Sequence, residues 1–190
     1  MKAVKVACFA DEGGSFTPCS SVCVALVCFE KDASLDATPG GLYERLAGLL
    51  GWRRGELKWR SVKKAARRRG LDVSGVLGAI LEASLCYSVV RGHVGSSSET
   101  GLVKGELLLE AVSRVSGCMR GYSVSLVVDA HLAGSGTVRR AGRVLGAGYT
   151  RIGDSRVYRG VQLADLLAGA CSEGLLDPGW GCRVAPTSRG

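Results

Sequence analysis

Two apolar runs that each end in an aspartate constrain this chain most strongly. Residues 3–10 are almost unbroken alanine, valine, cysteine and phenylalanine up to Asp11, and the run at 122–129 ends in the same way at Asp129. Short apolar runs of this kind are typical of buried strands. If the two strands are parallel neighbours, both carboxylates lie at one edge of a sheet, which is where α/β proteins gather their chemistry.

The remaining pattern alternates between strands and helices. The length of 190 residues suits one domain, and 46% hydrophobic with 22% charged residues is typical of a globular chain. Apolar periodicity predicts an α/β layout with a central sheet, in one domain over residues 1–176, and an irregular tail over 177–190. The predicted strands are 3–10, 20–30, 85–92 and 122–129, with 149–158 as strand or loop; the predicted helices are 39–52, 61–69, 73–84, 102–115, 136–146 and 161–174, and 91–101 is the clearest loop.

Two further acids stand in unusual settings. Asp165 is the one charged residue between Gly160 and Ser172, in a predicted helix with a small apolar packing face. A carboxylate buried there is costly unless it has a partner. Glu56 is the sole acid among nine basic residues. Both acids are therefore candidates for a functional site.

Each of the four acids also has an ordinary interpretation. Asp11 and Asp129 could cap turns or helix starts, as aspartates often do. Asp165 could pair with an arginine such as Arg156 or Arg159. Glu56 could balance its basic neighbours. These alternatives remain open at the level of single residues, and it is the repetition of the setting that favours a shared role.

Acids that converge on one sheet edge repel one another unless a divalent cation lies between them. Hard cations take oxygen ligands, and Mg²⁺ typically binds one or two carboxylates together with substrate phosphates. Two such ions can hold the attacking and leaving oxygens of a phosphodiester. We therefore predict a Mg²⁺ or Mn²⁺ site built from these four acids.

Three nearby residues are auxiliary candidates. Glu12 points away from Asp11 if the strand continues, and joins it if a turn begins there. His131 could assist proton transfer, or it could be a surface or capping histidine. Asp154 precedes the last predicted helix and could join either the acids or a salt-bridge network.

The net charge of +8 is concentrated in one segment. Residues 53–69 hold nine basic residues and one acid, which leaves 16 basic and 16 acidic residues elsewhere. Like charges four apart on a helix destabilise it by about 0.2–0.5 kcal/mol per pair, and a polyanion alongside would reverse that effect. A solvated basic face is the alternative to a phosphate-binding surface. The candidate nucleic-acid contacts are Arg53, Arg54, Lys58, Arg60, Lys63, Lys64, Arg67 and Arg68.

Eight cysteines occur without any CxxC pair. Several lie inside apolar runs, where cysteine behaves as a small hydrophobic residue, so we expect mainly buried free thiols. Disulfides and a metal site remain as alternatives. No apolar run approaches the roughly 18 residues of a membrane span, and acids follow the first strand where a signal peptide would need small residues. We therefore expect no membrane association and a cytoplasmic location.

Four short motifs occur in a characteristic order. They are FADEGG at 9–14, ELKW at 56–59, VVDAH at 127–131 and VQLADLLAGA at 161–170. Together they resemble an RNase H-like family catalogued as domain of unknown function 3800. The resemblance implies a mixed sheet flanked by helices. It also implies that Asp11, Glu56, Asp129 and Asp165 stand where RNase H-like nucleases hold their metal-binding acids.

The sequence thus leads to a main hypothesis and two rivals. The main hypothesis is a metal-dependent nuclease of RNase H-like type that acts on DNA or RNA. The first rival is a nucleic-acid-binding or mobile-element or defence accessory protein without turnover. The second is a hydrolase of small phosphorylated molecules, which would use the acids but not the basic segment. The oligomeric state stays open.

Overall fold

The computed structural model describes residues 3–15, 19–31, 41–53 and 55–183. Predicted features at 39–40 and 184–190, and the candidate Arg54, lie outside these residues. The strands are β1 (Lys5–Gly14), β2 (Ser20–Glu30), β3 (Cys86–Val94), β4 (Ser123–Asp129), β5 (Ala147–Gly153) and β6 (Gly179–Cys182). The helices are α1 (Leu42–Leu49), α2 (Trp59–Arg68), α3 (Val73–Ala83), η2 (Ser97–Glu99), α4 (Thr100–Ser116), η3 (Gly117–Met119), α5 (Ser135–Leu145) and α6 (Arg159–Ser172).

The six strands form one mixed sheet in the order β5-β4-β1-β2-β3-β6. β4 runs parallel to both β1 and β5, whereas β1–β2, β2–β3 and β3–β6 are antiparallel. The pairing of β1 with β4 ends at Ala10 and Val128, one residue before the aspartate of each strand. The expected arrangement of two parallel neighbours is therefore present, and both aspartates lie at the same edge.

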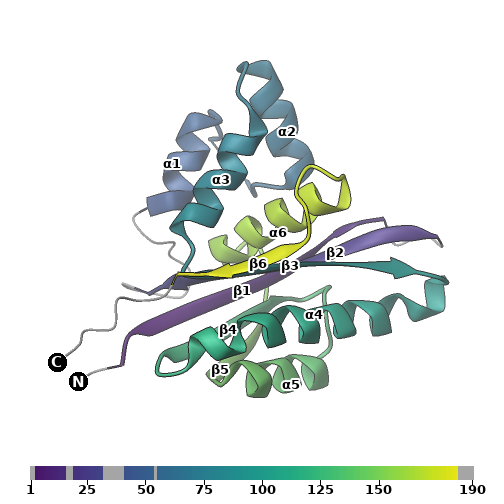
Figure 1. Cartoon of the computed structure of the whole chain (residues 1–190). Helices are drawn as coiled ribbons and strands as arrows, with labels where there is room; N and C mark the ends of the chain where they lie inside the picture. Colours follow the sequence, from purple (N-terminus) through teal and green to yellow (C-terminus); the bar gives the residue numbers. More distant parts are fainter. Residues whose placement is uncertain (1–2, 16–18, 32–40, 54, 184–190) are drawn as a thin grey trace.

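Helices cover both faces of the sheet (Figure 1). α1, α2, α3 and α6 lie on one face, and α4 and α5 lie on the other. Successive side chains of β1 alternate between the two layers, so Phe9 packs with α6 whereas Cys8 and Ala10 pack in the α4 layer. The same alternation points Asp11 toward the α6 layer and Glu12 toward the α4 layer.

Glycines allow α6 to lie directly on the sheet. A Cβ atom at Gly13 of β1 would come within 2.5 Å of the α6 backbone at Ala168 and Gly169. A Cβ at Gly160 would lie 2.3 Å from the Phe9 ring, and one at Gly169 would lie 2.5 Å from Trp59. Three glycines thus bring α6 close to both β1 and α2.

Six cysteines form disulfides, which corrects the expectation of mainly free thiols. Cys8 pairs with Cys28, Cys86 with Cys182, and Cys23 with Cys171. The first two pairs sit directly opposite each other on adjacent strands, and the third joins β2 to α6. Cys19 and Cys118 are free. Strand register decides the first two pairings and the packing of α6 on the sheet decides the third, and sequence spacing reveals neither.

Several other predicted element boundaries differ from those in the structure. β3 continues to Val94 and α4 starts at Thr100, so the predicted loop at 91–101 is short. α2 starts at Trp59, two residues before the predicted helix. The tail that we predict to be irregular contains β6, which pairs with β3. Within the described residues, no helix is long and apolar enough to cross a membrane.

Candidate functional site

The carboxylates of Asp11, Glu12 and Asp129 come together at the end of β1 and β4. One oxygen from each lies within 4.8 Å of the other two. Asp11 and Asp129 are buried, with 4% and 6% of their surface exposed. Their oxygens accept backbone hydrogen bonds of 2.8 Å, from Glu12 N and His131 N respectively. The Asp129 bond lies in the turn after β4, as the ordinary interpretation predicts, whereas the Asp11 bond lies within β1, and the carboxylates still converge.

Glu12 joins this group although β1 continues beyond it to Gly14. β4 ends beside Asp11, so Glu12 has no paired residue on that side of β1. Its side chain is 9% exposed and forms an ion pair of 2.6 Å with Lys104 of α4. The other carboxylate oxygen, Oε2, is buried and has no hydrogen-bond partner among the described residues.

Asp165 reaches the same site from α6. Its Oδ2 accepts a 2.9 Å hydrogen bond from the backbone N–H of Trp59, the first residue of α2. A carboxylate is favourable at this position because helix N-termini carry unpaired N–H groups and a partial positive charge. The expected arginine partners are engaged elsewhere, since Arg156 pairs with Asp154 and Arg159 with Glu44.

The crowding of acids raises two pKa values. Burial, together with the smaller effects of the charges of Asp129, Glu12 and Asp165, raises the pKa of Asp11 to about 9. Burial also raises the pKa of Asp165, although the Trp59 N–H and Lys58 oppose the change. Neighbouring carboxylates that share a site disfavour each other's ionisation.

Gln162 organises the segment that leads into α2. Its amide is buried one turn before Asp165. Its Oε1 accepts hydrogen bonds from Leu57 N at 2.7 Å and from the Tyr43 hydroxyl at 2.9 Å, and its Nε2 donates to Ser155 O at 2.6 Å. One side chain therefore fixes residues 56–58 against α6 and the turn before it.

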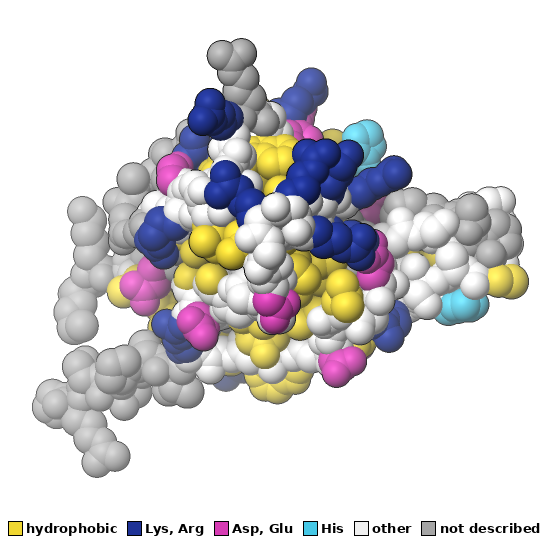
Figure 2. Space-filling model, turned by 90° about the horizontal axis from the view of Figure 1, so that it is seen from above, with side chains coloured by type: hydrophobic (Ala, Val, Ile, Leu, Met, Phe, Trp, Pro, Cys, Tyr) yellow, Lys and Arg dark blue, Asp and Glu magenta, His cyan; other side chains and the backbone are white. Residues whose placement is uncertain are grey.

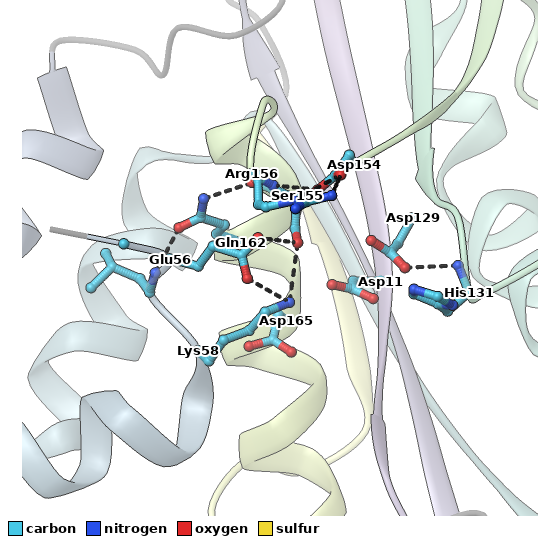
Figure 3. Close-up of polar contacts among 12 residues, drawn as sticks. Asp11, Glu56, Lys58, Asp129, His131, Asp154, Ser155, Arg156, Gln162 and Asp165 are labelled. Carbon is cyan, nitrogen blue, oxygen red and sulfur yellow. Dashed lines mark hydrogen bonds and ion pairs between the residues drawn. The ribbon is translucent and has the colours of Figure 1, made fainter.

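Lys58, rather than Glu56, approaches the aspartates (Figure 3). Burial alone would lower the pKa of Lys58, but the surrounding acids, of which Asp165 and Asp11 contribute most, outweigh burial and raise it. Glu56 accepts a 2.9 Å hydrogen bond from Ser155 Oγ and lies 3.7 Å from the Lys58 ammonium. It is not among the three grouped carboxylates. Among the four predicted acids, Glu56 alone is absent from the residues that line the cleft over the aspartates.

A cleft of about 780 Å³ opens over these groups. Asp11, Glu12, Asp129 and Asp165 all line it, together with Lys58, Trp59, Arg60 and His131. Asp154 does not line the cleft. It is bound by Arg156, whose hydrogen bonds lower the pKa of Asp154 to about 2. Of the auxiliary candidates, Glu12 and His131 thus lie at the site, and Asp154 belongs to a local salt bridge.

The basic segment lies beside this cleft, on the face covered by α1, α2 and α3. Arg53, Arg60, Lys64, Arg67 and Arg68 are exposed. Viewed from this side, Lys and Arg side chains are spread over the surface, most of them in the upper half of the view, with acidic side chains among them (Figure 2). Within the described chain, Lys64, Arg67 and Arg68 form no ion pair.

Two members of the basic segment point inward instead. Lys63 pairs with Glu173 and sits 5.6 Å above the Trp59 ring. Lys58 faces the acids, as described above. Trp59 is 6% exposed and packs in the core between α2 and α6. Trp59 therefore serves packing of α2 on α6.

The residues at the site fit a divalent cation. All the donors are carboxylate oxygens, which are the ligands that Mg²⁺ and Mn²⁺ prefer. Glu12 presents a buried, unpartnered oxygen from a side chain that is more than nine-tenths buried. Such an orphaned acceptor is destabilising unless a positive group meets it. Asp11, Glu12, Asp129 and Asp165 are the residues that would hold the ion.

Three contributors to the site escaped sequence reasoning. Gln162 left a signal, because it is a lone amide in an apolar helix, three residues before Asp165. Ser155 and Lys104 left none, since a serine in a turn and a lysine in an amphipathic helix are ordinary. Their roles depend on which elements the fold brings together.

Comparison with solved structures identifies the fold of this chain. No protein-family model matches the chain, and no curated protein matches it. Solved structures do match. The ribonuclease H2 of Pyrococcus horikoshii OT3 has a TM-score of 0.50 and 12% identity, over 89% of this chain and 72% of that one. A chain of the PCNA:RNase HII complex from Archaeoglobus fulgidus has a TM-score of 0.50 and 15% identity, over 90% and 73%.

A third similar structure is Bst-RNase HIII in complex with Mn²⁺, with a TM-score of 0.50 and 14% identity. The match covers 93% of this chain and 57% of that one, so this chain spans a little over half the length of Bst-RNase HIII. At these identities the likeness defines the fold. The chain has an RNase H-like α/β fold, with a mixed six-stranded sheet and flanking helices, as predicted.

Proposed function

We propose that this protein is a divalent-metal-dependent nuclease of RNase H-like type, and that it belongs to the family catalogued as domain of unknown function 3800. The observation that carries the proposal is the convergence of Asp11, Glu12 and Asp129 within 4.8 Å, in a cleft that Asp165 also lines. The similar solved structures are ribonucleases by name, and one of them holds Mn²⁺.

Each group in the cleft has a chemical role in this proposal. A bound Mg²⁺ or Mn²⁺ would act as a Lewis acid toward a phosphodiester. Lys58 presents an ammonium at the same place and can hold a phosphate oxygen. His131 is exposed at the rim, where it can hold or release a proton near a leaving oxygen.

The direct test is cleavage of labelled single-stranded DNA, duplex DNA, RNA and RNA–DNA hybrid with Mn²⁺ or with chelator. We expect cleavage of at least one polymer that chelator abolishes. Mn²⁺ at about 100 times its dissociation constant should also stabilise the fold by about 2.7 kcal/mol. Salt-dependent binding without cleavage or metal stabilisation would identify a binding module, and hydrolysis confined to small phosphoesters would identify a phosphohydrolase.

The exposed cations of α2 should matter for polymers only. We expect that changing Lys64, Arg67 and Arg68 to glutamine weakens nucleic-acid binding at least about tenfold and reduces the salt dependence of binding by up to about three phosphate contacts. The matched control changes Arg139, Arg140 and Arg143 of α5, which removes the same charge from the opposite face of the sheet. Equal losses in both variants, measured by fluorescence anisotropy, would assign binding to net charge alone.

A further inference from the structure

Three cysteine sulfurs gather beside the edge strand β6, away from the acidic cleft. Cys86 of β3 forms a disulfide with Cys182 of β6, and Cys118 of η3 is a free thiol. The three Sγ atoms all lie within 4.8 Å of one another. Cys28 is also in register with Cys86, but it is bonded to Cys8. Cys118 is therefore the free thiol of this group.

Helix α4 brings Cys118 to this place. α4 packs on β2 and β3, and η3 follows its last turn. Met119 of η3 is buried in the same apolar layer as Cys86, and Cys118 and Cys182 pack against that layer. Cys118 is itself only half-buried. Its thiol is thus accessible to solvent and lies next to a disulfide.

A thiolate beside a disulfide is the reactant pair of thiol–disulfide exchange. Cys118 loses its proton to solvent, and its sulfur forms a bond to Cys86 Sγ. The bond between Cys86 and Cys182 breaks, its electron pair passes to Cys182 Sγ, and that sulfur takes up a proton. One disulfide and one thiol are present before and after the step, so it needs neither an oxidant nor a reductant.

Burial decides which sulfur is released. Cys86 is 1% exposed within an apolar layer, whereas Cys182 is half-buried on the edge strand. A thiolate is disfavoured in apolar surroundings, so release of Cys182 Sγ is the easier route. The exchange therefore favours a disulfide between Cys86 and Cys118 over one between Cys118 and Cys182.

The disulfide between Cys86 and Cys182 ties β6 covalently to β3. β6 has four residues, two of them glycine, and lies at the edge of the sheet against β3 (Figure 1). Short strands that contain glycine pair weakly. Just after β6, the Arg183 N–H donates a 2.8 Å hydrogen bond to the Leu85 carbonyl. Without the disulfide, β6 depends on this short ladder of backbone hydrogen bonds, and its departure makes β3 the new sheet edge.

We propose that Cys86, Cys118 and Cys182 form an internal thiol–disulfide exchange site, in which Cys118 displaces Cys182 from Cys86 and releases β6. The observation that carries the proposal is the grouping of a free thiol and a disulfide within 4.8 Å. None of the three cysteines lines the acidic cleft, so the inference does not depend on the proposed nuclease activity.

Disulfide mapping of the full chain tests the proposal. The oxidised protein is alkylated with iodoacetamide for increasing times without reductant. It is then digested with trypsin and a glutamate-specific protease, which cuts at Glu173 between Cys171 and Cys182. We expect a linked peptide pair that contains Cys86 and Cys118, together with an equal amount of label on Cys182. Because the exchange is intramolecular, this fraction should not change with protein concentration.

Matched variants separate Cys118 from the other free thiol. Cys118→Ser removes the attacking sulfur and should reduce the label on Cys182 at least about tenfold. Cys19→Ser removes the exposed free thiol and should give the wild-type products. Amide hydrogen exchange over residues 174–183 should be slower in Cys118→Ser than in wild type, because β6 then stays bonded to β3.

Two results would overturn the proposal. One is label on Cys118 alone, with Cys182 still bonded to Cys86 in every molecule. The other is equal label on Cys182 in wild type and Cys118→Ser, because the displacing thiol would then come from elsewhere. If Cys118→Ser does not fold, Cys182→Ser decides. Oxidised glutathione should close a disulfide between Cys86 and Cys118 in this variant, whereas glutathione adducts alone would show that the two sulfurs do not meet and would overturn the inference.

Discussion

Asp11→Asn protein is expected to be more stable than wild type without metal and yet inactive with it. The Asp11 carboxylate is buried among three other acids, so its ionised form destabilises the metal-free fold. Asparagine has nearly the same shape and no charge. In the proposed function the same substitution removes a metal ligand, and losing several kcal/mol of transition-state stabilisation corresponds to a rate loss of about 10³-fold.

The pH dependence of stability should follow from the same residue. The pKa of Asp11 is raised from 3.8 to about 9, so between these values the folded protein binds a proton that the unfolded chain has released. Stability of the metal-free wild type should therefore fall as pH rises from about 4 and level off above about 9. In Asp11→Asn this part of the slope should disappear. Thermal melting with chelator, from pH 5 to pH 9, measures both curves.

A matched variant excludes general effects of removing an acid. Asp177 is exposed and does not line the cleft. Asp177→Asn should keep wild-type cleavage and the wild-type slope of melting temperature against pH. Lower metal-free stability of Asp11→Asn at pH 8, or undiminished cleavage by it, would show that Asp11 is not part of a crowded metal site.

The second large effect concerns the disulfide between β2 and α6. Cys23 and Cys171 are 148 residues apart in sequence, so their bond closes a very long loop of the unfolded chain. Replacing both with alanine should lower the free energy of unfolding by about 5 kcal/mol in the loop-entropy account. For a chain of this size, each kcal/mol corresponds to about 2–4 °C in melting temperature. Guanidinium unfolding under non-reducing conditions gives the free-energy change directly.

The disulfide between Cys8 and Cys28 provides the comparison. All four cysteines of the two bonds are fully buried, but this second bond closes a loop with a separation of only 20 residues. Its double alanine variant should lose about 2 kcal/mol less. A larger loss in this variant, or unfolding that is unaffected by reductant in the wild type, would contradict the loop argument.

The sequence was informative wherever a local pattern determines position. Asp11 and Asp129 end parallel strands, so their shared edge followed from the two apolar runs. Asp165 was identifiable as the one charge in an apolar helix. Glu12 and Glu56 were not distinguishable in this way, because the reach of each depends on where β4 ends and on what Gln162 binds.

Features that depend on contacts between distant elements were missed or misjudged. Cysteine pairing requires the register of β1 on β2 and of β3 on β6, which spacing alone does not contain. Lys104 approaches Glu12 only because α4 covers the face opposite to α6. The Lys58 side chain points inward rather than toward solvent because Gln162 holds residues 56–58 against α6.

The close seating of α6 on β1 has a consequence for how this molecule can change over evolution. At Gly13 the main chain of the strand touches the main chain of the helix, with no side chain in between. The distance between the two layers that carry Asp11 and Asp165 is therefore fixed by peptide groups, whose dimensions do not vary. Core side chains elsewhere are free to drift in size, whereas one added methyl group at residue 13 would force the layers apart.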